Sequence, residues 1–169
     1  MTIVDTPPST VDPDSFRSLL RHQASTVTVV TVPGQPPVGF TATSFTSVSL
    51  HPPLVSFCLN HASSSWPAVA MAGHLAVHLL AAHQQELART FATSGIDRFA
   101  GPTRWQAGPH GVPLLDGALA VLVCRVVQRV DAGDHAVVLA APLHTRHLGT
   151  GNPLIYHQGH YTHLTEGTT

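Results

Sequence analysis

The chain has 169 residues, of which 43% are hydrophobic and 10% charged. This length fits one ordinary domain, and the balance excludes a disordered chain, which would need few apolar and many charged residues. The formal net charge is −1, and the eight strongly basic residues are all Arg. A nucleic-acid clamp or a polybasic membrane binder would need a larger positive charge.

The two cysteines, Cys58 and Cys124, each stand inside an apolar run. Two such thiols indicate a reducing compartment rather than a disulfide framework, so we expect a cytoplasmic protein. The longest apolar runs, such as residues 118–124, are too short to cross a bilayer. Residues 1–10 contain neither an Arg nor an apolar stretch typical of a signal peptide. We therefore expect no membrane and no nucleic-acid partner.

The first predicted element is a short helix. Residues 1–11 are polar and contain Pro, so we expect a mobile arm there. Asp12 and Pro13 are typical of an N-cap and a first helical residue. Apolar residues follow at positions i, i+3 and i+4, which predicts a helix over about 13–23 with one apolar face.

Beyond residue 25 the apolar pattern changes to the period of two that strands show. Clusters of Pro and Gly separate the runs and indicate turns. A Gly-rich and Pro-rich stretch over 94–113 is predicted to be a long loop, which suggests a functional role. The predicted strands are 26–32, 38–43, 54–59, 75–80, 118–130, 135–143 and 154–164, and the other predicted helices are 66–73 and 84–92.

Many strands with three short helices, and no alternation of strand and helix, predict a mainly β fold. We expect an antiparallel barrel of six to seven strands with the helices at its periphery. The sequence has no Gly-rich fingerprint of a doubly wound dinucleotide-binding fold.

Three polar clusters are candidates for ligand binding. Six of the eleven residues in 39–49 carry hydroxyls that can donate to phosphate or ring oxygens, although an exposed edge strand explains this cluster better when it is taken alone. Ser63, Ser64 and Ser65 precede a predicted helix, where they fit a phosphate site or a plain N-cap equally well. His135 follows a Gly-Asp turn, which fits a ligand contact but in isolation favours a surface histidine.

The thirteen histidines raise the question of a metal site. His157 and His160 would face opposite sides of a strand, and few acidic residues or cysteines accompany the histidines. We therefore expect no dedicated metal site. The sequence also lacks a G-x-S-x-G elbow, and cysteines in apolar strands are usually inert. Nucleophilic catalysis is not predicted.

The ordered motifs together resemble the flavin reductase-like family with the FMN-binding split barrel, the small reductase components of two-component flavin monooxygenases. The resemblance spans residues 16–164 and implies an antiparallel split β-barrel of Greek-key type over residues 12–165, with a C-terminal tail at 166–169. The motifs that carry it are 27–31, 38–45, 47–55, Asn60 with the serines that follow, 97–101, 114–118, 132–135 and 153–159.

The resemblance implies an NAD(P)H:flavin oxidoreductase that transfers hydride from NADH or NADPH to FMN or FAD. Reduced flavin would pass to a partner oxygenase, and the reductase would be a homodimer. Catalysis would depend on the positions of the two cofactors and not on an acid or base. His135 and Tyr156 are implied to contact the nicotinamide. The implied flavin contacts are Gly39, Phe40, Thr41, Thr43, Ser44, Cys58, Leu59, Asn60, Ser64, Ser65 and Arg98.

Three positions depart from the family pattern. Thr26 stands where the family commonly has Gly, His61 where it often has a basic residue, and Ala136 where it often has Thr. The change at His61 lowers the charge available to a phosphate, because imidazole is mostly neutral at pH 7. Alternative interpretations are a flavoenzyme that retains FMN and acts on its own substrate, a non-catalytic flavin or haem carrier, and a purely structural barrel.

Overall fold

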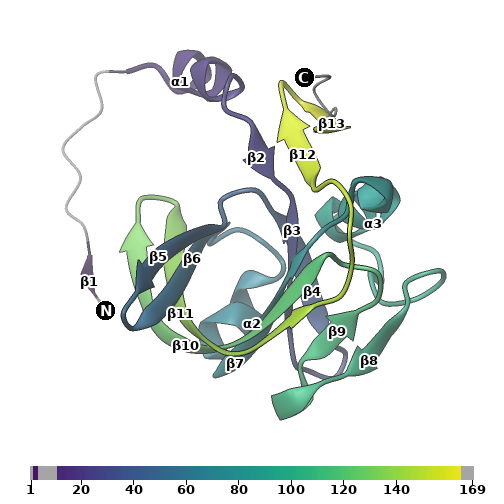
Figure 1. Ribbon diagram of the computed structural model, residues 1–169. Helices are drawn as coiled ribbons and strands as arrows, with labels where there is room; N and C mark the ends of the chain where they lie inside the picture. The colour runs from purple at the N-terminus through teal and green to yellow at the C-terminus, as the bar shows by residue number, and fades with distance from the viewer. Residues whose placement is uncertain (1, 4–10, 165–169) are drawn as a thin grey trace.

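The protein folds into a curled antiparallel sheet with short helices around it (Figure 1). The computed structural model describes residues 2–3 and 11–164. Most of the expected arm at 1–11 and the whole tail at 166–169 lie outside the described residues. The strands are β1 (Thr2–Ile3), β2 (Ser25–Thr26), β3 (Thr28–Val32), β4 (Val38–Ala42), β5 (Thr46–Leu50), β6 (Pro53–Asn60), β7 (His74–Leu79), β8 (Trp105–Ala107), β9 (Pro113–Leu115), β10 (Ala120–Ala132), β11 (His135–His147), β12 (Leu154–His157) and β13 (His160–His163).

The main sheet has the strand order β4-β3-β7-β10-β11-β6-β5, with β1 parallel to β10 beside this path. Neighbours along the path are antiparallel. The central hairpin β10–β11 has strands of 13 residues and turns at Gly133-Asp134. Gly133 has φ 63°, as a tight two-residue hairpin turn requires. The mainly β, antiparallel prediction is confirmed, and the path agrees with the expected six to seven strands.

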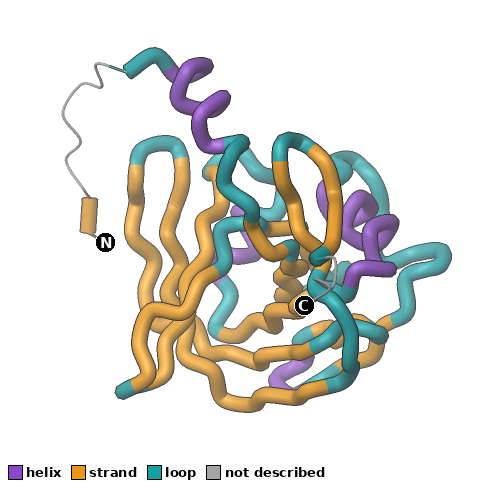
Figure 2. Tube along the Cα trace, turned by 45° about the horizontal axis from the view of Figure 1, so that its top comes forward, coloured by secondary structure: helices purple, strands orange, loops and turns teal. Residues whose placement is uncertain are grey.

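The sheet is curled, as Figure 2 shows. Strand β4, at one end of the strand order, contacts β6 near the other end. The rings of Phe40 and Phe57 lie 5.8 Å apart between centroids across this gap. The Cys58 N–H donates to the Ser44 hydroxyl at 2.9 Å. Within the described part of the chain no backbone ladder joins the two strands. We call this set of contacts between residues 40–44 and β6 the seam.

Strand β3 is buried along its whole length, because both of its faces are covered. Alternate valines belong to a cluster inside the curled sheet and to a second cluster beneath a peripheral helix. A fully buried Val contributes about 1.5–3 kcal/mol, so this short run is a large part of the core. The buried Thr31 hydroxyl donates to the Pro113 carbonyl at 2.6 Å, which attaches β9 to the sheet.

The described residues contain three α-helices, as predicted. The predicted cap at Asp12 is present, because the Ser15 N–H donates to its carboxylate at 2.9 Å. The first helix buries none of its residues and stands away from the main sheet, whereas the other two helices pack against that sheet (Figure 1). None of the described helices is long and apolar enough to span a membrane. The helices are α1 (Pro13–Leu20), α2 (Trp66–Met71) and α3 (Gln85–Ala92), with 3₁₀ turns at Ala82–Gln84 and Pro109–Gly111.

Three predicted segments were wrong in detail. The stretch 94–113 is not one loop, because it contains β8 and the 3₁₀ turn before β9. The strand predicted over 154–164 is the hairpin β12–β13. Its turn contains Gln158 and Gly159, both with positive φ, which a continuous strand does not tolerate. The prediction also lacked a strand between residues 43 and 54, where the chain forms β5, an exposed edge strand paired with β6, in line with the edge-strand interpretation of the hydroxyls at 39–49.

Candidate functional site

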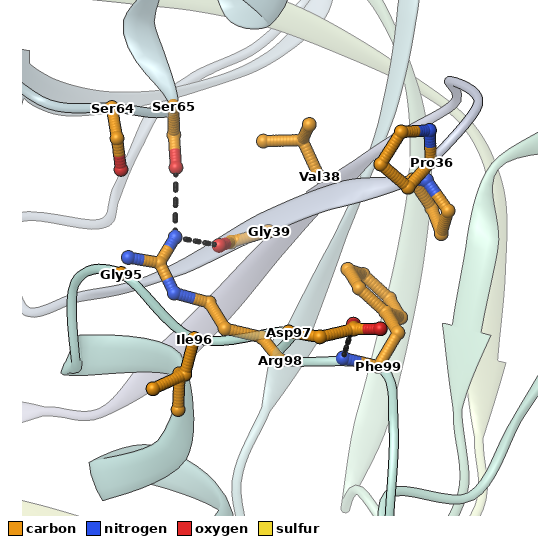
Figure 3. A pocket seen from close by; sticks show the side chains of 11 residues that line it. Pro36, Val38, Gly39, Ser64, Ser65, Gly95, Ile96, Asp97, Arg98 and Phe99 are labelled. Carbon is orange, nitrogen blue, oxygen red and sulfur yellow. Dashed lines mark hydrogen bonds between the residues drawn. The ribbon is translucent and has the colours of Figure 1, made fainter.

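Arg98 lies at the centre of a cleft between the start of β4, the start of α2 and the segment after α3. Its Nη1 atom donates to the Gly39 carbonyl at 2.7 Å and to the Ser65 hydroxyl at 3.0 Å (Figure 3). Its Nε atom donates to the Thr93 carbonyl at 2.9 Å. Burial lowers the pKa of the Arg98 guanidinium, which still remains protonated at neutral pH. The cleft thus contains a fixed positive charge.

The cleft has a volume of about 280 Å³ and gathers four of the predicted flavin residues. Ser64 lies at its rim with an exposed side chain, while Ser65 is buried. Of the other lining residues, Val38, Asp97 and Phe99 lie in motifs that carry the family resemblance. The rest come from the Pro-rich turn before β4 and from the segment at Gly95 and Ile96, which the sequence did not assign to a site. The lining residues are Pro36, Pro37, Val38, Gly39, Ser64, Ser65, Gly95, Ile96, Asp97, Arg98 and Phe99.

Aromatic contacts hold the Arg98 segment against the sheet. The Phe99 ring lies edge-on to Phe91 of α3 at 5.1 Å and to Trp105 of β8 at 5.4 Å. The Thr103 hydroxyl donates to the Arg98 carbonyl at 2.9 Å. Edge-on aromatic pairs are each worth about 0.5–1.5 kcal/mol beyond their burial. The guanidinium is therefore presented by a segment that is fixed on both sides.

Gly39 is required by close packing at the floor of the cleft. A Cβ atom at this position would lie 2.6 Å from the Phe91 ring and 3.1 Å from the Val30 carbonyl oxygen. Phe91 is fully buried and cannot move aside cheaply. Glycine therefore leaves the Gly39 carbonyl accessible to Arg98 and keeps β4 close to α3.

The serines before α2 act differently from simple caps. Ser65 is the N-cap residue, but its side chain makes no capping hydrogen bond, and its hydroxyl instead meets Arg98. The Ser65 N–H donates to the Ser63 hydroxyl at 3.2 Å. Helix α2 has only six residues. The polar groups at its start are thus organised by Ser63 and Arg98.

Several predicted flavin residues have structural contacts of their own. Phe40 and Leu59 are buried in the main core cluster, so only their backbone groups remain for a ligand. The Thr41 hydroxyl donates to the Ala88 carbonyl at 2.6 Å and ties β4 to α3. Ser44 and Cys58 form the hydrogen-bonded contact at the seam already described, with the Ser44 hydroxyl also donating to the Cys58 carbonyl at 3.3 Å.

Asn60, at the end of β6, belongs to a second polar cluster together with Asp134 and His135. The Asn60 amide donates to the Asp134 carboxylate at 3.3 Å, and the His135 Nδ1 atom lies 2.7 Å from the other carboxylate oxygen. Hydrogen bonding and charge from His135 lower the pKa of Asp134. The hairpin tip is therefore fastened to the end of β6.

The other predicted positions are distributed as follows. Thr43 is exposed just beyond β4. Tyr156 lies on β12, in the three-stranded sheet β13-β12-β2, with its ring 5.2 Å from Tyr161. Figure 1 shows β12 well apart from the β10–β11 turn that carries His135, so one copy of the chain does not bring these two residues together.

His61, the departure from the family pattern, pairs with the β10 strand. Its Nε2 atom lies 3.3 Å from the Asp131 carboxylate, and its ring lies 4.9 Å from that of Trp66. The imidazole is thus turned toward β10, and Arg98 supplies the cleft's cation.

The chain belongs to the flavin reductase family, since the model of the flavin reductase like domain matches residues 20–165. It is 44% identical over 151 residues to a Rhodococcus erythropolis protein named NADH:FMN oxidoreductase, covering 86% of this chain and 79% of that protein. It is 37% identical over 155 residues to a Mycobacterium tuberculosis protein named flavin-dependent monooxygenase, reductase subunit HsaB, covering 90% of this chain and 82% of that protein.

Among solved structures, the fold matches the Streptomyces globisporus NADH:FAD oxidoreductase SgcE6 in complex with NAD and FAD fragments. The TM-score is 0.88 at 32% identity, covering 96% of this chain and 100% of that chain. A flavin reductase domain protein from Arthrobacter has a TM-score of 0.87 at 36% identity, covering 92% of this chain and 98% of that chain.

Proposed function

We propose that this protein is an NADH-dependent flavin reductase that reduces FMN or FAD and supplies reduced flavin to a partner oxygenase. The observation that carries the proposal is the cleft in which Arg98 meets Ser65 and Gly39. This cleft lies at one end of β4, and the Asn60–Asp134–His135 cluster lies beside the seam. The names of the relatives, NADH:FMN oxidoreductase and monooxygenase reductase subunit, support the same activity.

The cleft fits the phosphate and ribityl part of a flavin nucleotide. A half-buried guanidinium and the exposed Ser64 hydroxyl offer charge-assisted and neutral donors to phosphate oxygens. A single cation with hydroxyls favours moderate affinity, which suits a flavin that must leave after reduction. Arg98 and Ser64 would therefore bind the phosphate, and Ser65 would hold Arg98 in place.

The ring of the flavin would lie along the seam. The seam begins at Phe40, next to the cleft residue Gly39, and continues to Ser44 beyond the end of β4. From Gly39 to Ala42 the strand extends by about 10 Å, at about 3.3 Å per residue. Because Phe40 and Leu59 are buried, the contacts there would come from backbone groups and from the exposed Thr43.

His135 would orient the nicotinamide over that ring. Bound flavin supplies the hydride acceptor, and NADH supplies the hydride. The chain's own residues are left to bind and to align the two rings, and no proton donor is needed for the transfer itself. With Nδ1 turned to Asp134, the Nε2 atom of His135 remains for the ligand.

The direct test is aerobic turnover of NADH by the purified protein with and without added FMN. We expect NADH absorbance to fall only when both flavin and protein are present. If the protein oxidised neither NADH nor NADPH in a flavin-dependent way, the proposal would be rejected. A yellow protein without NADH turnover would instead indicate a flavoenzyme with its own substrate, and a Soret band would indicate a haem carrier.

Replacement of His135 by Ala is expected to raise the KM for NADH about tenfold and to leave the KM for FMN within about twofold, since one ligand hydrogen bond is lost. Steady-state kinetics with each substrate varied in turn measures both constants. His144→Ala, on the exposed end of the same strand, is the control. Equal changes in both constants would contradict the assigned role.

We also propose that the protein is a homodimer in which the apolar face of α1 is covered by the second copy. Phe16, Leu19 and Leu20 are 54%, 66% and 43% exposed, and the helix buries none of its residues. An exposed apolar helix face of this kind is typical of an interface. The Gln158 N–H donates to the Arg21 carbonyl, so the end of α1 is held to the β12–β13 turn.

Leu19→Asp is expected to shift the protein from dimer to monomer, because it places a charge in the apolar contact. Size-exclusion chromatography with light scattering gives the mass directly. Ser18→Asp, the neighbouring residue on the same helix, is the matched control and should remain dimeric. A monomeric wild type, or a dimeric Leu19→Asp protein at the same concentration, would contradict the interface.

The partner would be an oxygenase, because relatives are named as reductase subunits of monooxygenases. The place of action would be the cytoplasm. Free Cys58 and Cys124 support a reducing compartment.

A further inference from the structure

Arg129, on β10, lies outside the cleft but holds the helix that leads into it. Its Nε and Nη2 atoms donate to the Val69 carbonyl at 3.0 and 2.8 Å, and Nη2 also donates to the Ala72 carbonyl. Val69 is fully buried, and Ala72 is the C-cap residue of α2. One guanidinium thus binds two carbonyls at the end of the helix, from a strand 57 to 60 residues away in sequence.

The contact with Arg129 supplies the capping interactions that α2 does not make with its own residues. The helix has six residues, no side-chain cap at its start and no basic residue in its last turn. Helices this short are not stable by themselves, so tertiary contacts decide where they lie. A cation bound to the last carbonyls satisfies them and interacts favourably with the helix dipole. Burial lowers the pKa of Arg129, which nevertheless stays charged.

The other end of the same helix carries the serines of the cleft. The Val69 N–H donates to the Ser65 carbonyl at 3.1 Å, so the carbonyl that Arg129 holds belongs to the helical turn that starts at Ser65. Ser65 in turn contacts Arg98. The chain of contacts from β10 to the cleft is therefore continuous, and it runs through one turn of helix.

We propose that Arg129 is a positioning residue for the phosphate end of the flavin site, acting through α2 on Ser64 and Ser65. The inference rests on the proposed function. It separates two roles: Arg98 provides charge inside the cleft, whereas Arg129 fixes the distance between the serines and that charge without touching the ligand.

The experiment compares the affinities for FMN and riboflavin, which differ only by the phosphate, by titration of flavin fluorescence. Arg129→Ala is expected to weaken FMN binding about tenfold, the equivalent of one lost hydrogen bond, and to change riboflavin binding less than about twofold. Arg129→Lys keeps the charge but cannot hold both carbonyls as a planar fork does, so we expect FMN binding about threefold weaker.

Two controls separate positioning from other effects. Arg125→Ala removes an exposed cation of the same strand and should leave both affinities unchanged. Val112→Ala opens a cavity in the cluster beneath β9 and lowers stability without altering the FMN preference. The Lys variant remains informative if the Ala variant does not fold.

Parallel losses for FMN and riboflavin, or no loss for FMN, would overturn the role of Arg129. A Lys variant equal to wild type would attribute the effect to charge alone and would overturn it too. If wild-type protein bound FMN no better than riboflavin, the phosphate subsite would fail together with this inference. Turnover of NADH with riboflavin would then still test the reductase activity separately.

Discussion

Acidification from about pH 7.5 to about pH 5 is expected to lower the free energy of unfolding by about 2 kcal/mol through His78 alone. The side chain is fully buried on β7. Its Nε2 atom accepts the Leu115 N–H at 3.0 Å, and its Nδ1 atom lies 3.0 Å from the Val29 carbonyl. Since a backbone N–H only donates, Nε2 carries no proton and the imidazole is neutral.

The sign follows from the pKa values in the two states. Burial lowers the pKa of His78 from 6.5 to about 4 in the folded protein. Between these two pKa values the His78 imidazole is protonated in the unfolded chain and neutral in the folded chain. The free energy of unfolding therefore falls as the pH drops from about 6.5 toward about 4. Protonation at Nε2 would also place its N–H opposite the Leu115 N–H, so the hydrogen bond from Leu115 would be lost.

The matched variant is His78→Phe, which keeps a ring of similar size but has no titrating group. It leaves the Val29 carbonyl and the Leu115 N–H without their partner, so we expect a loss of about 2–5 kcal/mol near pH 7.5. Its loss on acidification should be smaller than that of wild type by about 2 kcal/mol. Urea denaturation at the two pH values measures both quantities.

His147→Gln, at an exposed position near the end of β11, controls for the many other histidines. It should retain the wild-type difference between the two pH values. Equal acid sensitivity in wild type and His78→Phe would show that His78 does not carry the effect.

The position of His78 also explains why its titration would reach the site. Together with Thr31, it attaches β9 to the sheet. Strand β9 pairs with β8, whose Trp105 supports Phe99 in the Arg98 segment. Release of this hairpin on acidification would therefore loosen the cleft before the whole fold is lost.

Much of the fold was predictable from the sequence because periodicity reports burial directly. The β-branched run of β3 and the Asp12-Pro13 start of α1 are local signals, and the structure has both. The hairpin β12–β13 was missed because a run of apolar and polar residues hides a two-residue turn, although Gly159 was its visible signal. The exposure of α1 was not predictable, since an amphipathic pattern does not say what covers the apolar face.

The candidate site was less predictable than the fold. Family resemblance singled out Arg98, Gly39 and Ser65, but their mutual contact joins segments 33 and 59 residues apart. Periodicity carries no information on such pairs. Arg129 left no signal at all, because nothing in a strand sequence shows that one arginine caps a distant helix. Conversely, the Thr41 hydroxyl suggested a ligand contact, and the structure uses it to hold α3.

Replacement of Arg98 by Ala is expected to have the largest effect on flavin affinity, weakening FMN binding by about ten- to a hundredfold. The variant removes the cleft's charge, whose hydrogen bonds to a phosphate are each worth about 1.5–3 kcal/mol. It also removes the contacts to Gly39 and Ser65 that bring β4 and α2 together. Titration of flavin fluorescence, with riboflavin beside FMN, measures the loss.

The two consequences of this substitution can be separated. Arg98→Lys keeps a charge but cannot serve the Gly39 carbonyl, the Ser65 hydroxyl and the Thr93 carbonyl together, so we expect a smaller loss for FMN. Raised salt should weaken wild-type FMN binding and have little effect on the Ala variant, because screening acts on the charge that this variant lacks. If Arg98→Ala bound FMN as tightly as wild type, the flavin phosphate would not bind in this cleft. If its affinities for FMN and riboflavin fell equally, Arg98 would only support the folding of its own segment.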